Sequence, residues 1–78
     1  MEQKANEEIV KRLQRANGHL SKVIEMIMEG DADIDVAQQM QAVSKAVINA
    51  KNLYIRNSID SRLEGSAARD LAELSKFL

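Results

Sequence analysis

The fold of this chain depends most on residues 34–63, which read IDVAQQMQAVSKAVINAKNLYIRNSIDSRL. This stretch contains neither proline nor glycine, the residues that most strongly interrupt a helix. Its apolar residues recur at alternating steps of four and three: Val36, Met40, Val43, Val47, Ala50 and Tyr54. The spacing predicts one helix of about 30 residues, or about 45 Å at 1.5 Å per residue. Further apolar side chains in the stretch fall on other faces, so this helix needs cover on several sides.

The segment before it shows the same spacing, with apolar residues at Ile9, Leu13, Ala16, Leu20, Val23 and Ile27. We expect a helix from Glu7 to about Glu29, with Asn6 as its N-cap and Gly30 as the left-handed residue that follows it. Gly18 costs such a helix about 1 kcal/mol relative to alanine, which a close backbone approach at that position would explain.

Aspartates and a glycine mark the remaining boundaries. Asp31 or Asp33 is expected to cap the long helix, with Asp35 in its first turn. Gly65 and Ser66 predict its end and the start of a last helix, whose apolar residues are Ala67, Leu71, Leu74 and Leu78. The chain is therefore predicted to be all-α, with three helices.

Length and composition predict self-association. A single domain of 78 residues (1–78) buries too little surface to be stable without extra support. Cysteine is absent and His19 is the one histidine, so disulfides and metal ions are not expected to supply that support, and no cofactor is expected. Because the two shorter helices cannot cover the long one, we expect a second copy to do so. The result is an antiparallel dimer with a four-helix core, or a dimer of such dimers.

The net charge is −1, but the charges are unevenly placed. Residues 9–24 hold four cations and no acid, and residues 36–59 hold three cations and no acid. On a helical wheel, an arc of about 40° contains Lys4, Lys11, Arg15 and Lys22, with Arg12 beside them and the apolar stripe opposite. Such a ridge can contact phosphates, or it can be no more than a solvated face. It is the feature of this neutral chain that favours a nucleic-acid partner.

The other polar residues do not predict a catalytic or metal site. His19 lies at the edge of the ridge and is expected to be a surface histidine. Asp33 and Asp35 are expected to stabilise a helix start rather than to bind a cation. The serines lack a neighbouring base, so the chain is not expected to be an enzyme. The methionines expected to fill the core are Met26, Met28 and Met40.

Two motifs resemble a known family of transcriptional repressors. Residues 34–46, IDVAQQMQAVSKA, resemble the C-I-D-V-x-x-Q-x-x-A-V-x-x-A segment of the CsoR/RcnR/FrmR repressors. Residues 12–19, RLQRANGH, resemble the R-L-x-R-I-x-G-Q motif of the same family. The resemblance covers about residues 10–63, and the two motifs have the separation that the family shows.

The resemblance implies an all-α homodimer that pairs into a disc-shaped homotetramer, binds double-stranded operator DNA and represses transcription. A cytoplasmic location is expected because the sequence has no membrane-spanning run and its acidic N-terminus is not a signal peptide. Arg12 and Arg15 match the two arginines of the first motif, and Lys45 lies close to a basic position that many members carry. The residues expected to contact DNA are Lys11, Arg12, Arg15, Lys22 and Lys45. No apolar run is long enough to cross a bilayer, so no membrane partner is expected.

The family's sensing ligands are not retained in this chain. The resemblance places Asp33 at a cysteine, Ser58 at a histidine, and Arg62 at a further cysteine or histidine of the family's inducer site. Cu(I) needs thiolates, and sensing of formaldehyde or persulfide needs a nucleophilic sulfur, so the usual inducers are not expected to bind. Three interpretations stay open: a different signal, such as an anion at Ser58 and Arg62, constitutive DNA binding, or loss of sensing with action through hetero-oligomers.

Two other functions fit parts of the pattern. A helical dimeric adaptor would use its basic surface to bind an acidic protein, and it would not prefer DNA over other polyanions. A small helical mutase of the chorismate-mutase type would need cations inside a closed pocket, whereas the predicted ridge lies on the outside of its helix.

Overall fold

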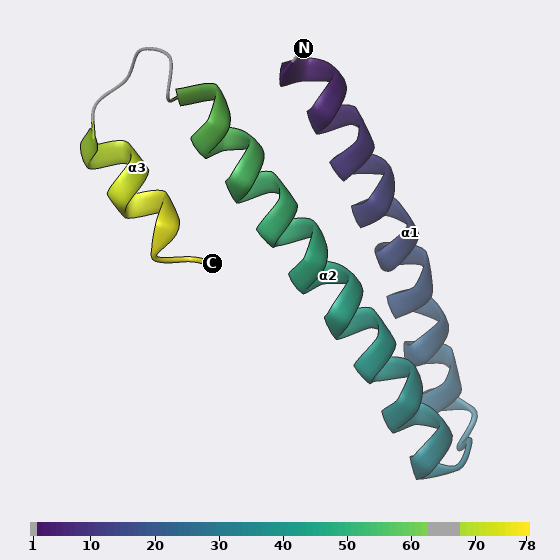
Figure 1. Cartoon of the computed structure of the whole chain (residues 1–78). Coiled ribbons are helices and arrows are strands. Elements are labelled where there is room, and N and C mark those ends of the chain that lie inside the picture. Colours follow the sequence, from purple (N-terminus) through teal and green to yellow (C-terminus); the bar gives the residue numbers. More distant parts are fainter. Residues whose placement is uncertain (1, 63–67) are drawn as a thin grey trace.

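The structure, a computed structural model, describes residues 2–62 and 68–78, with side chains for residues 6–60 and 72–78. It contains three helices, α1 (Glu2–Met28), α2 (Asp33–Arg62) and α3 (Ala68–Ser75), and no strand within these ranges. α1 and α2 form an antiparallel hairpin, and α3 lies beside the C-terminal part of α2 (Figure 1). The prediction of an all-α protomer with three helices is confirmed.

α1 is longer than its apolar spacing predicted. It begins at Glu2 rather than Glu7, so Asn6 lies inside the helix and the prediction of Asn6 as N-cap is wrong. The residues before Asn6 include glutamate, glutamine, lysine and alanine, which all favour helix and extend it beyond that cap. No described atom outside α1's own backbone lies within 4 Å of a Cβ built on Gly18, so the close approach expected there is not found within the protomer.

The turn between α1 and α2 confirms Gly30 as the left-handed residue. Its φ is 77°, and its N–H donates to the Ile27 carbonyl at 3.1 Å. The Asp31 N–H donates to the Met26 carbonyl at 3.0 Å, and together the two bonds form a Schellman motif. A local backbone conformation that suits glycine therefore reverses the chain and makes the hairpin.

α2 has the predicted length of 30 residues, but its N-cap differs from the prediction. The Ala32 carbonyl accepts from the N–H groups of Asp35 and Val36 at 3.0 and 3.1 Å. Ala32 therefore occupies the N-cap in place of Asp31 or Asp33. Asp33 and Asp35 lie in the first turn, where their charges complement the helix dipole.

The start of α3 is close to the predicted one. α3 begins at Ala68, one residue after the first apolar residue predicted for it. The predicted boundary residues Gly65, Ser66 and Ala67 lie outside the described residues.

Only half of each predicted apolar stripe is buried. The buried rows, spaced by seven residues, are Ile9, Ala16 and Val23 in α1 and Val36, Val43 and Ala50 in α2. The exposed rows are Leu13, Leu20 and Ile27, exposed by 42–56%, and Met40, Val47 and Tyr54, exposed by 43–49%. A two-helix hairpin buries one narrow seam, so the rows rotated from it by about 40° stay in solvent.

The methionines do not all fill the core. Met26 packs against the cluster of Val23, Val36 and Val43, as expected. Met28 is 81% exposed and Met40 is 49% exposed, so the prediction is wrong for these two within the protomer. Met40 belongs to one of the exposed apolar rows, which the hairpin alone does not cover.

The protomer is a single layer of helices. Its principal extents are 52 × 24 × 13 Å, and the smallest is close to the diameter of one helix, about 10–12 Å. Both sides of the seam between α1 and α2 are therefore open in the part of the chain that the structure describes. Within the same ranges, no helix has an apolar stretch long enough to span a membrane.

Candidate nucleic-acid interface

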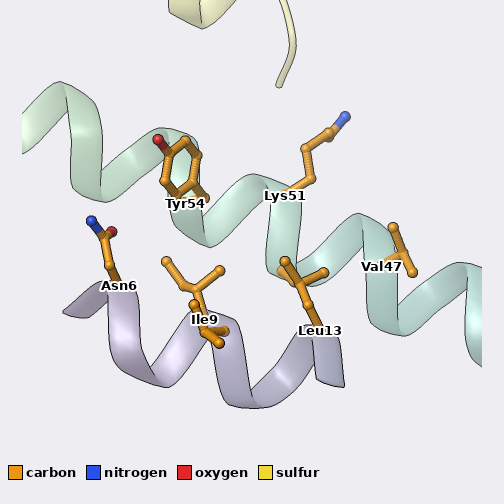
Figure 2. Close-up of a pocket in the computed structure, with 8 residues that line it drawn as sticks. Asn6, Ile9, Leu13, Val47, Lys51 and Tyr54 are labelled. Atoms are coloured by element: carbon orange, nitrogen blue, oxygen red, sulfur yellow. The ribbon is translucent and has the colours of Figure 1, made fainter. Parts of the chain in front are cut away.

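The two sides of the hairpin differ in chemistry. One side, named here the apolar face, carries the two exposed rows: Leu13, Leu20, Ile27, Met40, Val47 and Tyr54. Figure 2 shows part of this face, where Ile9 and Leu13 of α1 point toward α2. With Val47 and Tyr54 they line an open groove of about 450 Å³. A surface this apolar on a small protein marks a contact surface rather than a solvated one.

The opposite side, named here the basic face, carries most of the exposed cations, whereas Lys51 lines the groove of the apolar face. At 100° per residue, the side chains of the basic face are rotated away from the seam in the sense opposite to the apolar rows. The basic face consists of Lys11, Arg12, Arg15 and Lys22 from α1 and Lys45 and Arg56 from the outer part of α2, all of them exposed. The side chain of Lys4, also predicted for the ridge, lies outside the described side chains. The five residues expected to contact DNA therefore lie on one side of the hairpin.

A groove of about 420 Å³ runs along the seam within the basic face. The groove, named here the polar groove, is lined by Arg12, Arg15, Ala16, His19, Ala46 and Asn49. Ala16 is buried and Ala46 is small, so the middle of the groove is free of long side chains. None of the six lining residues carries a carboxylate.

His19 connects the two helices and is not a free surface side chain. Its Nε2 lies 2.6 Å from Oε1 of Gln39 in a partly buried contact. The prediction of a simple surface histidine is wrong because the hairpin brings Gln39, twenty residues further along the chain, against it. Since a carbonyl oxygen accepts, Nε2 carries the hydrogen in this arrangement and Nδ1 is left for other partners.

Arg12 has an acidic neighbour one turn away on α1. Its Nε lies 3.5 Å from Oε1 of Glu8, and the two side chains are 47% and 52% exposed. An exposed pair at this spacing contributes about 0.3–0.5 kcal/mol. An incoming phosphate can therefore displace Glu8 from Arg12 at little cost.

The positions that match the family's inducer site are not brought together within one protomer. Asp33 is exposed at the first residue of α2, and Ser58 is half-buried near the other end of that helix. The 25 residues from 33 to 58 correspond to about 38 Å of helix at 1.5 Å per residue. The side chain of Arg62, the last residue of α2, lies outside the described side chains.

The chemistry of these three residues does not fit a soft metal ion. A carboxylate, a hydroxyl and a guanidinium provide no thiolate or imidazole, which Cu(I), Ni(II) and Co(II) prefer. A guanidinium also repels a cation. Among the described residues, no group of three or more histidine, aspartate or glutamate side chains is placed to hold a metal ion.

A comparison with protein families gives the class of this chain. The family model of the metal-sensitive transcriptional repressors matches residues 5–78. The chain therefore belongs to this family, that of the CsoR and RcnR repressors, and the resemblance found in its motifs is confirmed. The family consists of transcriptional repressors and not of enzymes, so the mutase interpretation is set aside. No curated protein and no solved structure matches the chain.

Two residues of this region were missed by reasoning from the sequence. Gln39 and Asn49 stand neither in a run of cations nor in the apolar stripe, so neither was singled out. The signal was the turn at Gly30, since folding the two predicted helices back about it brings Gln39 opposite His19. Asn49 enters the polar groove by the same antiparallel alignment.

Proposed function

We propose that this protein is a DNA-binding transcriptional repressor that acts as an oligomer, with its basic face against the DNA backbone. One observation carries the proposal: among the described side chains of α1 and α2 in this chain from a repressor family, six of the seven exposed cations gather on one side of the hairpin. The residues assigned to phosphate contacts are Lys11, Arg12, Arg15, Lys22 and Lys45. Because these contacts carry no sequence information directly, specificity is assigned mainly to the shape and deformability of the DNA.

A second copy of the chain completes the fold in this proposal. The protomer exposes 6113 Å². A compact protein of 8.7 kDa is expected to expose about 4,700 Å², which leaves an excess of roughly 1,400 Å². Obligate dimers bury about 1,000–2,500 Å² on each partner, so the excess matches one such interface. Two hairpins packed antiparallel through their apolar faces give a four-helix core, with both basic faces outward.

Two such dimers form the proposed disc-shaped homotetramer, which acts in the cytoplasm. Each chain is a single DNA-binding and oligomerisation domain with one basic face, so the tetramer presents four of them. Antiparallel pairing also brings Asp33 of one copy toward Ser58 and Arg62 of the other, so the altered inducer site lies between copies. Its donors do not suit a soft metal, and we assign the protein either a signal of different chemistry, such as an anion, or none. In the latter case it binds DNA constitutively or acts through hetero-oligomers.

The test is binding to a fluorescently labelled duplex from upstream of the protein's own gene, measured by anisotropy at several salt concentrations. The logarithm of the binding constant should fall with the logarithm of salt by about 0.9 per neutralised phosphate. Lys22→Ala should weaken binding to all sequences and reduce that slope by about 1 for each copy that contacts DNA. Lys76→Ala, a cation beyond the end of α3, is the matched control and should leave the slope unchanged.

Binding that is independent of salt, or an equal slope for Lys22→Ala and the unmodified chain, would contradict the proposal. Equal affinity for the duplex and for heparin at matched charge would instead support the adaptor function, in which the basic face binds an acidic protein.

A further inference from the structure

We propose that the polar groove is a binding site for a small tetrahedral oxyanion, a sulfate or phosphate group carried by a free small molecule. The site is distinct from the family's inducer positions, because Asp33, Ser58 and Arg62 do not line it. Its regulatory consequence rests on the proposed function, since Arg12 and Arg15 are also assigned to DNA.

The polar groove concentrates positive charge in a concave space. Arg12 and Arg15 are three residues apart on α1, so their guanidinium groups reach the groove from the same side of the helix. Asn49 adds an amide from α2, and no lining residue is acidic. The volume of about 420 Å³ lies within the range of about 300–1,000 Å³ that is typical of small-molecule sites. Hydrogen bonds from a guanidinium to an anion are charge-assisted and therefore stronger than neutral ones.

Glu8 is the one carboxylate that pairs with these arginines among the described side chains, and it pairs weakly. It contacts Arg12 through Nε at 3.5 Å, and both side chains are about half exposed. The terminal nitrogens of the guanidinium stay available, and the pair contributes no more than about 0.5 kcal/mol. A divalent oxyanion that accepts from two guanidinium groups therefore binds in preference to Glu8.

His19 adds an imidazole to the lining of the polar groove. Its Nε2 lies 2.6 Å from Oε1 of Gln39 on α2, and this contact holds the ring between the two helices. Nδ1 is thereby left for another partner.

The same tetrahedral group is offered by a DNA phosphate and by a free anion, and the two compete for Arg12 and Arg15. A free anion in the polar groove neutralises two of the cations that the basic face presents to DNA. It would release the repressor from DNA without any of the soft-metal ligands that this chain lacks.

The direct test uses the ¹⁵N-labelled full chain without DNA, titrated with sodium sulfate at a constant ionic strength of about 0.15 M and followed by NMR. Sulfate is the probe because it is a tetrahedral dianion at neutral pH. We expect saturating shifts of backbone amides near residues 12–19 and 46–49, about tenfold weaker binding for Arg15→Ala, and little change for the control Arg56→Ala.

Three results would overturn the proposal: shifts that do not saturate, equal effects of Arg15→Ala and Arg56→Ala, or a loss of sulfate binding with Arg62→Ala alone, which would place the anion at the inducer positions. In a second arm, sulfate is added to the protein–duplex complex at constant ionic strength. The regulatory role is supported if sulfate releases the duplex from the unmodified protein but not from Arg15→Ala complexes that still bind DNA. Saturable sulfate binding without release refutes that role and leaves the site itself confirmed, whatever the outcome of the DNA-binding test.

Discussion

Replacing Val47 by glutamate is expected to separate the proposed dimer while each hairpin stays folded. Val47 is 43% exposed in the protomer and lies on the wall of the apolar groove. In a single chain the longer glutamate side chain can place its carboxylate in water, so the cost to the hairpin is small. In a dimer joined through the apolar faces, the same carboxylate is covered by the second copy.

The size of the effect follows from burial and symmetry. An unpaired buried carboxylate costs about 3 kcal/mol or more. Full burial of a valine side chain contributes about 1.5–3 kcal/mol, and the 43% that stays exposed in the protomer corresponds to about 1 kcal/mol. Twofold symmetry applies both losses twice, for a total of about 8 kcal/mol. At 1.4 kcal/mol for each factor of ten, the dimer Kd should rise by about 10⁶-fold.

Sedimentation velocity over a range of protein concentrations measures this change, and far-UV circular dichroism reports whether the helices persist. Ala42→Glu introduces the same charge at an exposed position on the other side of α2 and should leave the assembly unchanged. If Val47→Glu unfolds the chain, Val47→Ala provides the second measurement, with an expected weakening of about tenfold from lost apolar area alone. Sedimentation of Val47→Glu as the same species as the unmodified chain would refute the assignment of the apolar face to a second copy.

Three further changes test the local structure, each by urea denaturation at one fixed protein concentration. Gly30→Ala should destabilise the chain by about 1–2 kcal/mol, because φ is 77° there, although a Cβ would meet no atom within 4 Å. Gly18→Ala should instead stabilise it by about 1 kcal/mol, since this helical position is equally open, and a loss of stability would show that another copy approaches Gly18 closely. His19→Ala should cost about 1 kcal/mol by leaving Gln39 without its partner, whereas His19→Gln should cost much less; equal losses would show that the 2.6 Å contact contributes nothing.

The helices themselves could be predicted from short stretches of the chain. The absence of glycine and proline from residues 34–63 predicted the length of α2, and Gly30 predicted the turn, because both depend on interactions within one or two helical turns. The N-caps were harder, and the predictions of Asn6 and of Asp31 or Asp33 failed. Candidate N-cap residues differ in their contribution to helix stability by only about 1 kcal/mol. Residues with high helix propensity beside a candidate cap can outweigh this difference and move the helix start.

The division of the apolar stripe into buried and exposed rows required the packed hairpin. Steps of four and three fit one broad buried face as well as two narrow ones, and the rotation of α1 against α2 puts Val43 in the seam and Val47 on the open side. The polar groove arises in the same way, since Arg15 and Asn49 are far apart in the chain and meet through the register of the two helices. Helix formation depends on neighbouring residues and can be predicted from a sequence. Which side chains share a groove depends on contacts between residues that are far apart in the sequence, and these contacts are set by the packing of the two helices.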